Sequence, residues 1–223
     1  MKNYNFKLKR TTDGSFTLYS DKMQESYHSI NGAVQESNFI FIDRALAKIP
    51  KNKISVFEVG FGTGLNALLT WNYATDYKKN ITYNSIEAYP VKPELYKKLE
   101  YCNYCKNLND DDFISLHTCQ WNRPVNIKDS TFVLNKINSD LISFVFPEKQ
   151  YDVIFFDAFS PDKQPEMWTE KIFLNIFKSL IKGGILITYC AKGEVRRRMQ
   201  KSGFTVERIP GPPGKREILR ATK

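Results

Sequence analysis

The sequence predicts an α/β fold, in which a mostly parallel β-sheet carries helices on both faces. Two observations predict it. From residue 51 onward, short apolar runs of strand type alternate with helix-like segments, and a glycine-rich turn joins one of the strands to the helix that follows. A chain of 223 residues is long enough to bury a substantial core, and 42% apolar residues argue against disorder.

The individual elements follow from hydrophobic runs, helical spacing and turn residues. We expect strands at residues 54–59, 81–87, 132–135, 151–158 and 184–189, and helices at residues 64–75, 91–107, about 139–145, 168–180 and 194–201. A turn is expected at residues 182–184, and a closing antiparallel pair at residues 205–209 and 217–221. Residues 108–128 are polar, and no element is predicted there.

The first fifty residues differ from this repeating pattern. Residues 6–10 and 15–19 flank an Asp13-Gly14 turn, which predicts a β-hairpin. Residues 33–47 have apolar side chains near helical spacing, and Pro50 ends that segment. We therefore expect a hairpin and helix extension at residues 1–50 and a Rossmann-like domain at residues 51–223.

Composition limits the function classes. No run approaches the roughly 18 apolar residues of a membrane span, and the first ten residues lack the apolar centre of a signal peptide. We therefore expect a soluble cytoplasmic protein that contacts no membrane. The net charge is +9, and the segment 192–223 alone carries ten basic and three acidic residues. This clustering fits either a phosphate-backbone partner or a solvated surface.

The four cysteines also allow two interpretations. Without a secretion signal, they are expected to be reduced thiols. Cys102, Cys105, His117 and Cys119 together offer four zinc ligand types, but a His-x-Cys second half is not usual in zinc modules. We expect no metal.

The glycine-rich turn, Gly60-Phe61-Gly62-Thr63-Gly64, is either a ligand cradle or only a close-packed turn. Glycines let the backbone approach a ligand closely, and the N–H groups at a helix start can face it. A dinucleotide fold needs G-x-G-x-x-G to carry a pyrophosphate, whereas Leu65 stands at that last position here. No phosphate-binding Gly-Lys-Ser/Thr loop is present. The pattern favours an adenosine ligand without phosphates, namely S-adenosylmethionine.

Three acidic residues stand at or near the ends of predicted strands, where open α/β sheets bind ligands. Glu87 follows Gly60 by 27 residues and can accept two hydrogen bonds from a ribose diol. Asp140 is placed to accept from an adenine amino group, and Asp157 ends the strand at residues 151–158. Taken singly, Glu87 and Asp140 could also be solvated strand ends.

Two segments carry a resemblance to a known family. FEVGFGTGLN at residues 57–66 and DAFSPDKQPEMW at residues 157–168 resemble the methyltransferase domain of the MnmC family. Similar motifs occur at residues 27–29, 36–37, 41–42, 183–189, 195–197, 203–204 and 214–217, so the likeness covers most of the chain. It implies a class I S-adenosylmethionine-dependent methyltransferase fold.

The resemblance also implies a reaction. MnmC-like proteins N-methylate the 5-aminomethyl group of the wobble uridine, position 34 of certain tRNAs, which gives 5-methylaminomethyl-2-thiouridine. Long members fuse a flavin oxidoreductase, and no second glycine fingerprint precedes Lys223. We therefore expect the stand-alone methyl-transfer half, with a separate oxidoreductase supplying the substrate. Two alternatives stay open: an N-methyltransferase acting on a small molecule or a protein, and a noncatalytic tRNA-binding module.

The motifs, the chemistry of methyl transfer and the basic C-terminal segment together give the expected site residues. Asp157 is expected to orient the acceptor amine and take its proton, and Asp140 stands in Asn-Ser-Asp where the family tends to have Gly-Asp. The cofactor set is Glu58, Gly60, Gly62, Gly64, Asn66, Glu87, Asp140 and Asp157. The expected substrate and tRNA contacts are Tyr27, Phe159, Pro161, Trp168, Tyr189, Arg196, Arg197, Lys215 and Arg216. Trp168 could stack on the base, but an aromatic residue that opens a helix is more often part of the core.

Overall fold

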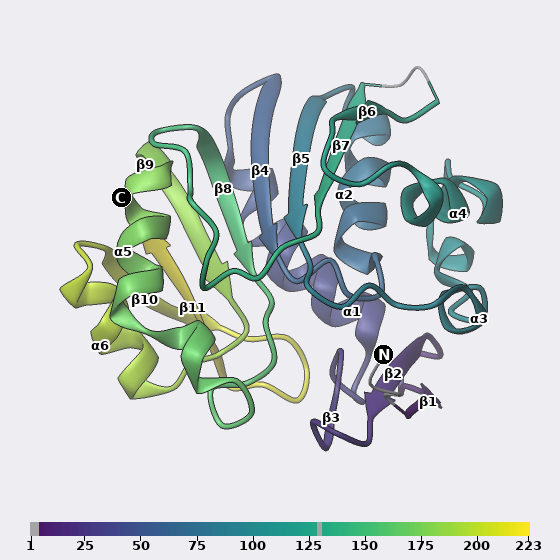
Figure 1. Ribbon diagram of the computed structural model, residues 1–223, viewed down its shortest axis with the longest axis horizontal. Helices are drawn as coiled ribbons and strands as arrows, with labels where there is room; N and C mark the ends of the chain where they lie inside the picture. Colours follow the sequence, from purple (N-terminus) through teal and green to yellow (C-terminus); the bar gives the residue numbers. More distant parts are fainter. Residues whose placement is uncertain (1–4, 129–130) are drawn as a thin grey trace.

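An eight-stranded sheet in the order β10-β11-β9-β8-β4-β5-β7-β6 forms the centre of the molecule (Figure 1). This computed structural model describes residues 5–128 and 131–223, so the first four residues of the predicted N-terminal extension lie outside the described part. The strands are β4 (Lys53–Val59), β5 (Asn80–Ile86), β6 (Val125–Asn126), β7 (Phe132–Ile137), β8 (Tyr151–Phe156), β9 (Leu180–Thr188), β10 (Thr205–Pro210) and β11 (Glu217–Thr222).

The middle of the sheet is parallel, as the alternation of strands and helices predicts. β5, β4, β8, β9 and β7 run the same way, whereas β6, β10 and β11 pair antiparallel with their neighbours. Successive side chains of a strand point to opposite faces of the sheet, so each strand contributes residues to the hydrophobic core on both faces. In β4, Val56 belongs to one buried cluster and Phe57 to the other; in β8, Phe155 and Phe156 divide in the same way.

Helices cover both faces of this sheet, which confirms the predicted class. α2 (Leu65–Asp76) and α4 (Asp110–Thr118) contribute to the cluster that contains Val56. α5 (Glu170–Ser179) and α6 (Gly193–Lys201) contribute to the cluster on the opposite face. Among the described residues, no helix has the length and apolar composition needed to span a membrane.

The strand order creates a crevice at one place. β4 lies between β5, the next strand in sequence, and β8, which follows much later. The connections that leave the carboxyl ends of β4 and β8 therefore run in opposite directions, and open α/β sheets bind ligands at such a switch point.

The N-terminal extension folds as a small sheet and a helical segment. β1 (Phe6–Arg10), β2 (Phe16–Ser20) and β3 (Glu25–Ser26) form an antiparallel sheet, which confirms the predicted hairpin. In Figure 1 this sheet lies below the carboxyl end of the central sheet. α1 (Ala33–Ser37) continues as a π-helical segment (Asn38–Asp43) and is followed by a 3-10 turn (Leu46–Lys48). This helical segment packs against α2 and β9 and shares their core cluster.

Two predicted helices are wrong. Residues 91–107 form only α3 (Pro93–Tyr96) and a 3-10 turn (Tyr101–Tyr104), because Glu100 between them has a left-handed φ of 52° that no helix accepts. Residues 139–145 form turns, because the Asp140 carboxylate accepts the Ile142 N–H at 2.9 Å and so competes with a helix.

Two further differences concern boundaries. The unassigned stretch 108–128 contains α4, whose start is a capping box between Asn109 and Asp112. β9 begins at Leu180 rather than at residue 184, so the turn expected at 182–184 is an irregularity inside the strand. Gly183 adopts a φ of 77° there.

Candidate active site

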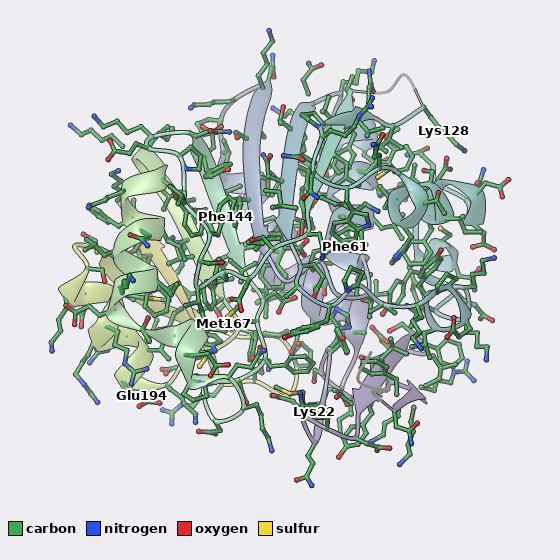
Figure 2. All side chains as sticks on the ribbon, in the orientation of Figure 1. Lys22, Phe61, Lys128, Phe144, Met167 and Glu194 are labelled. Atoms are coloured by element: carbon green, nitrogen blue, oxygen red, sulfur yellow. The ribbon has the colours of Figure 1, made fainter. Side chains whose placement is uncertain are left out.

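A cavity of about 1130 Å³ opens at the carboxyl ends of β4, β5 and β8. Its walls come from the N-terminal extension, the glycine turn, the ends of these strands and the loop after β8. Figure 2 labels three of the lining side chains, Lys22, Phe61 and Met167. Pockets for one small ligand commonly measure roughly 300 to 1000 Å³, so this cavity has room for a cofactor together with part of an acceptor.

The glycine turn needs glycine at all three positions. Gly60, Gly62 and Gly64 have φ values of 91°, 50° and 78°, a region that strains other residues. A Cβ on Gly60 would lie 3.1 Å from the Asp157 carbonyl oxygen, and one on Gly62 would lie 3.0 Å from the Tyr27 ring. Gly64 is the N-cap of α2 and does not line the cavity itself.

The two acids predicted to hold adenosine both line this cavity. Glu87 accepts the Gly62 N–H at 2.9 Å through Oε2 and the Tyr89 N–H at 2.7 Å through Oε1. Each carboxylate oxygen keeps a second lone pair for a ribose hydroxyl. Burial raises the pKa of Glu87. Asp140 is exposed at the rim, with one oxygen bound to the Ile142 N–H.

Asp157 lies where the glycine turn meets the end of β8. Asn66 from α2 donates its Nδ2 hydrogen to Asp157 Oδ2 at 2.8 Å. Burial raises the pKa of Asp157 to about 7; the Asn66 hydrogen bond opposes that rise, Glu36 adds to it and Lys215 opposes it. This carboxyl group therefore changes charge near neutral pH, as a proton acceptor for an amine requires.

Glu58 lies behind the cavity wall, so the expected direct contact with a cofactor is wrong for this residue. Its side chain is 1% exposed and does not line the cavity. The Ser85 hydroxyl donates to Glu58 Oε2 at 2.6 Å. Burial raises the pKa of Glu58 to about 8, and the neighbouring Asp157 adds to that rise. At neutral pH Glu58 is therefore mostly a neutral acid beneath the site.

Aromatic side chains also line the cavity, from Tyr27 beside Gly62 to Tyr189 beside the loop after Asp157. Tyr27 and Phe159 meet edge to face with ring centroids 5.0 Å apart. Tyr189 donates its hydroxyl hydrogen to the Ala158 carbonyl oxygen at 2.9 Å, which fixes the ring beside Asp157. These three residues line the cavity, as the expected substrate contacts require.

Other predicted contacts are not brought to the cavity. Trp168 is fully buried, packs on Phe156 and donates its Nε1 hydrogen to the Phe159 carbonyl oxygen at 2.8 Å, so it supports the loop and cannot stack on a base. Pro161 is buried and does not line the cavity either. Lys215 was expected on the tRNA surface, but its side chain is only 26% exposed, lies in the cavity wall and pairs with Glu36 at 3.2 Å.

The remaining basic residues differ in exposure. Arg197 on α6 and Arg216 in the β10–β11 loop are exposed. Arg196 is half-buried, with an Nε that has no hydrogen-bond partner among the described groups. Only the first two of these arginines present a fully accessible charge.

Two carboxylates in the N-terminal extension lie at the site but were not predicted from the sequence. Glu25 Oε2 accepts the Ser160 N–H at 3.1 Å and the Ser160 hydroxyl at 3.0 Å, which ties β3 to the loop after Asp157. Glu36 on α1 accepts the Ser29 N–H at 3.2 Å and faces Lys215. The only sequence signal for Glu36 was its place in the motif at residues 36–37.

The cysteine and histidine residues considered for zinc serve other contacts. His117 Nε2 lies 3.1 Å from the Thr63 carbonyl oxygen, and its ring stacks on Tyr96 at 3.8 Å. Burial lowers the pKa of His117 to about 3, so the imidazole is neutral. Cys102 donates to the Asn109 carbonyl oxygen. The part of the chain that the structure describes has no group of three or more such side chains arranged for a metal.

The site fits S-adenosylmethionine. Asn66 Oδ1 is buried in the cavity wall without a partner among the described groups, and such an acceptor suits an amino group. Glu87 has lone pairs for a ribose, and a Cβ at Gly60 or Gly62 would intrude on neighbouring groups. The strand order, the glycine turn and the acid after β5 together define a class I methyltransferase fold.

The chain belongs to the S-adenosyl-L-methionine-dependent methyltransferase family, whose profile matches residues 94–223. Its cofactor is therefore S-adenosylmethionine, in agreement with the prediction from the glycine spacing.

Curated relatives bear out the resemblance to MnmC. A tRNA 5-methylaminomethyl-2-thiouridine biosynthesis bifunctional protein MnmC from Nitrosospira multiformis is 30% identical over 219 residues, covering 91% of this chain and 34% of the relative. The same-named protein of Leptospira interrogans is 30% identical over 224 residues, covering 94% of this chain and 34% of the relative. The chain thus spans about a third of the length of these relatives.

Solved structures also resemble this chain. The crystal structure of MnmC2 from Aquifex aeolicus has a TM-score of 0.77 at 25% identity, covering 99% of this chain and 71% of that one. Spermidine synthase from Thermotoga maritima has a TM-score of 0.63 at 12% identity, covering 100% of this chain and 70% of that one, and supports the fold alone.

Proposed function

We propose that the protein transfers a methyl group from S-adenosylmethionine to the 5-aminomethyl group of the wobble uridine of tRNA, giving 5-methylaminomethyl-2-thiouridine. The observation that carries the proposal is Asp157, a carboxyl group with a pKa of about 7 at the junction of the glycine turn and the acceptor end of the cavity. The names of the MnmC relatives support the choice of substrate.

The cofactor supplies a methyl group already activated on a sulfonium, which an amine nitrogen takes by in-line displacement. Gly60 and Gly62 would let the backbone approach it, Glu87 would hold its ribose, and Asp140 its adenine amino group. Asn66 Oδ1 would accept a hydrogen bond from the amino group of the methionine part of the cofactor. Alignment can contribute roughly 7 to 11 kcal/mol and a positioned base roughly 3 to 5 kcal/mol, so holding the reactants is the larger task.

Asp157 acts on the acceptor in this proposal. Only a neutral amine has the lone pair needed to attack, and a carboxylate beside it accepts the hydrogen bond that orients it. The proton that the nitrogen loses passes to the Asp157 carboxylate. The Asn66 hydrogen bond holds that carboxylate in one orientation throughout.

The uracil ring would lie against the aromatic side chains of the cavity wall. Tyr27 and Phe159 offer ring faces and edges there, and Tyr189 closes the wall beside Asp157. Base–aromatic contacts of this kind contribute about 1 to 3 kcal/mol each and suit a base that is turned out of its stack.

Removing the carboxylate tests the catalytic role. Asp157→Asn should abolish methylation of a tRNA that carries the aminomethyl group, while S-adenosylmethionine binding, measured by calorimetry, changes little. Asp162→Asn is the matched control, because it makes the same change in the same loop at an exposed side chain that does not line the cavity. Wild-type turnover in Asp157→Asn would remove Asp157 from the mechanism.

The substrate class is tested separately. Purified protein, labelled cofactor and separated pools of tRNA, protein and small molecules should give label in the tRNA pool at the wobble nucleoside. Label in either other pool would favour the small-molecule or protein alternative. Failure to bind S-adenosylmethionine would favour the noncatalytic tRNA-binding module.

The tRNA backbone would contact exposed basic residues on the cavity side of the molecule. Arg197 and Arg216 remain candidates, and Lys92 and Lys163 at the cavity mouth join them. Removing a cation that neutralises one phosphate should lower the slope of log affinity against log salt by about 1. Arg197→Glu should therefore weaken tRNA binding and flatten that slope, whereas Lys53→Glu at the amino end of β4 should do neither. Equal effects of the two changes would identify general charge attraction instead.

A flavin oxidoreductase, separate or covalently joined, would supply the aminomethyl substrate from its carboxymethyl precursor. A tRNA substrate would place the reaction in the cytoplasm. Wobble nucleosides from a strain that lacks the gene should accumulate the unmethylated aminomethyl form.

A further inference from the structure

The cavity wall contains an ion pair between the two ends of the chain. Lys215 Nζ, from the loop between β10 and β11, lies 3.2 Å from Glu36 Oε2 on α1. Both side chains line the cavity, and they are only 26% and 11% exposed. Because protein covers most of each side chain, their charges are screened less than those of a pair on an open surface.

The same lysine is held toward the acceptor end of the cavity. Its Nζ lies 4.8 Å from the centroid of the Tyr189 ring, a cation–π distance. Tyr189 in turn donates its hydroxyl hydrogen to the Ala158 carbonyl oxygen, next to Asp157. Lys215 thus contacts Tyr189, which is bonded to the residue that follows Asp157.

We propose that Lys215 and Glu36 are opposed positioning residues for the acceptor amine: Lys215 favours the neutral amine and the ionised Asp157, and Glu36 holds Lys215 in place while limiting its effect. The amine part of this statement rests on the proposed function. A cation beside an amine makes protonation of that amine less favourable, which increases the fraction able to attack. A lysine without its partner would also compete with the substrate for Asp157.

The effects of the two charges on Asp157 agree in sign with this role. Glu36 raises the pKa of Asp157, and Lys215 lowers it. Glu58 lies beneath, Asn66 donates from α2 and Glu25 is bound to Ser160 on the far side of the loop. Burial raises the pKa of Tyr189, so the phenol stays neutral. Among these charged groups on the described chain, Lys215 is the cation that lowers the pKa of Asp157.

The pair therefore predicts shifts of opposite sign. Lys215→Met keeps the length of the side chain and removes its charge, so the pKa of Asp157 should rise. Glu36→Gln keeps an oxygen for the Ser29 N–H and removes the negative charge, so the pKa of Asp157 should fall. Each shift should be about half a unit or more, and the double variant should return close to the wild-type value.

Two readouts test this. A carboxyl-carbon NMR titration of Asp157 in the unloaded protein measures the shifts without any catalysis. Single-turnover methylation of aminomethyl-bearing tRNA against pH should show the acidic limb displaced in the same opposite directions, with cofactor affinity unchanged. Arg208→Met and Glu217→Gln are controls, because they break a pair of equal length, 3.2 Å, in the same hairpin. Neither control should move either profile.

The outcomes separate the two proposals. Shifts in the same direction, or none, would mean that the pair only ties the C-terminal loop to α1. A shifted titration with an unshifted rate profile would overturn the positioning role. If the wild-type protein does not methylate this tRNA, the proposed function fails, while the NMR titration still decides the effect of the pair on Asp157.

Discussion

Glu58→Gln should make the free energy of unfolding less sensitive to alkaline pH. The reason is that Glu58 is a buried acid whose pKa is raised to about 8 from an ordinary value of 4.5. The folded state then holds a proton that the unfolded chain releases. The stabilisation from this residue is complete below pH 4.5 and is lost as the pH rises through about 8. Each unit of pKa difference corresponds to about 1.4 kcal/mol.

The magnitude follows from that difference. Between about pH 5.5 and about pH 7.5 the ionisation of Glu58 should lower the free energy of unfolding of the wild-type protein by about 2 to 3 kcal/mol. Glutamine has nearly the same shape, cannot ionise and offers an oxygen to the Ser85 hydroxyl, which now lies 2.6 Å from Glu58 Oε2. The variant should lack this part of the pH dependence while keeping stability close to that of wild type at the lower pH.

Urea unfolding at the two pH values measures this difference. Asp157, with a pKa raised to about 7, makes the free energy of unfolding of both wild type and Glu58→Gln fall with rising pH. The difference between the two proteins therefore reports on Glu58. Glu148→Gln, at an exposed position, is the matched control and should leave the pH dependence unchanged. Equal pH dependence in Glu58→Gln and wild type would refute the assignment of a buried neutral acid.

Three other substitutions test the surroundings of the site. Gly64→Ala should lower the free energy of unfolding by about 2 kcal/mol or more in urea titrations, because φ is 78° and the new Cβ would lie 2.8 Å from His117 Nε2. Asn66→Ala removes a hydrogen bond that lowers the pKa of Asp157, so the NMR titration of that carboxyl group should move upward by about 1 unit. Trp168→Phe leaves a loop carbonyl without its donor and should cost about 1 to 3 kcal/mol in thermal unfolding, with no change in the salt dependence of tRNA binding.

Much of the central fold was predictable because its signals are local. The apolar run of β4, the glycines after it and the helical spacing of α2 are adjacent in sequence, and all three were predicted within a residue or two. α4 had a local signal too, the Asn109 and Asp112 capping box, which the polar character of the stretch obscured.

The failed elements have tertiary causes. Residues 91–107 have the composition of a helix, but Tyr96 and Tyr101 are both buried, and Glu100 adopts a left-handed conformation between them. Propensity is a weak preference, and packing overrode it here. Trp168 at the end of the site motif allowed either a stacking role or a core role, and its indole is part of the core.

By itself, the sequence determined the type of ligand, since glycine spacing and acids at strand ends depend on a few neighbouring residues. Only the tertiary structure decided which charges meet in the cavity wall. Glu36 and Lys215 are far apart in the sequence and form an ion pair in the cavity wall, where the β10–β11 loop meets α1. The protonation of Asp157 depends on burial and on these two charges, and neither effect is encoded in any local pattern.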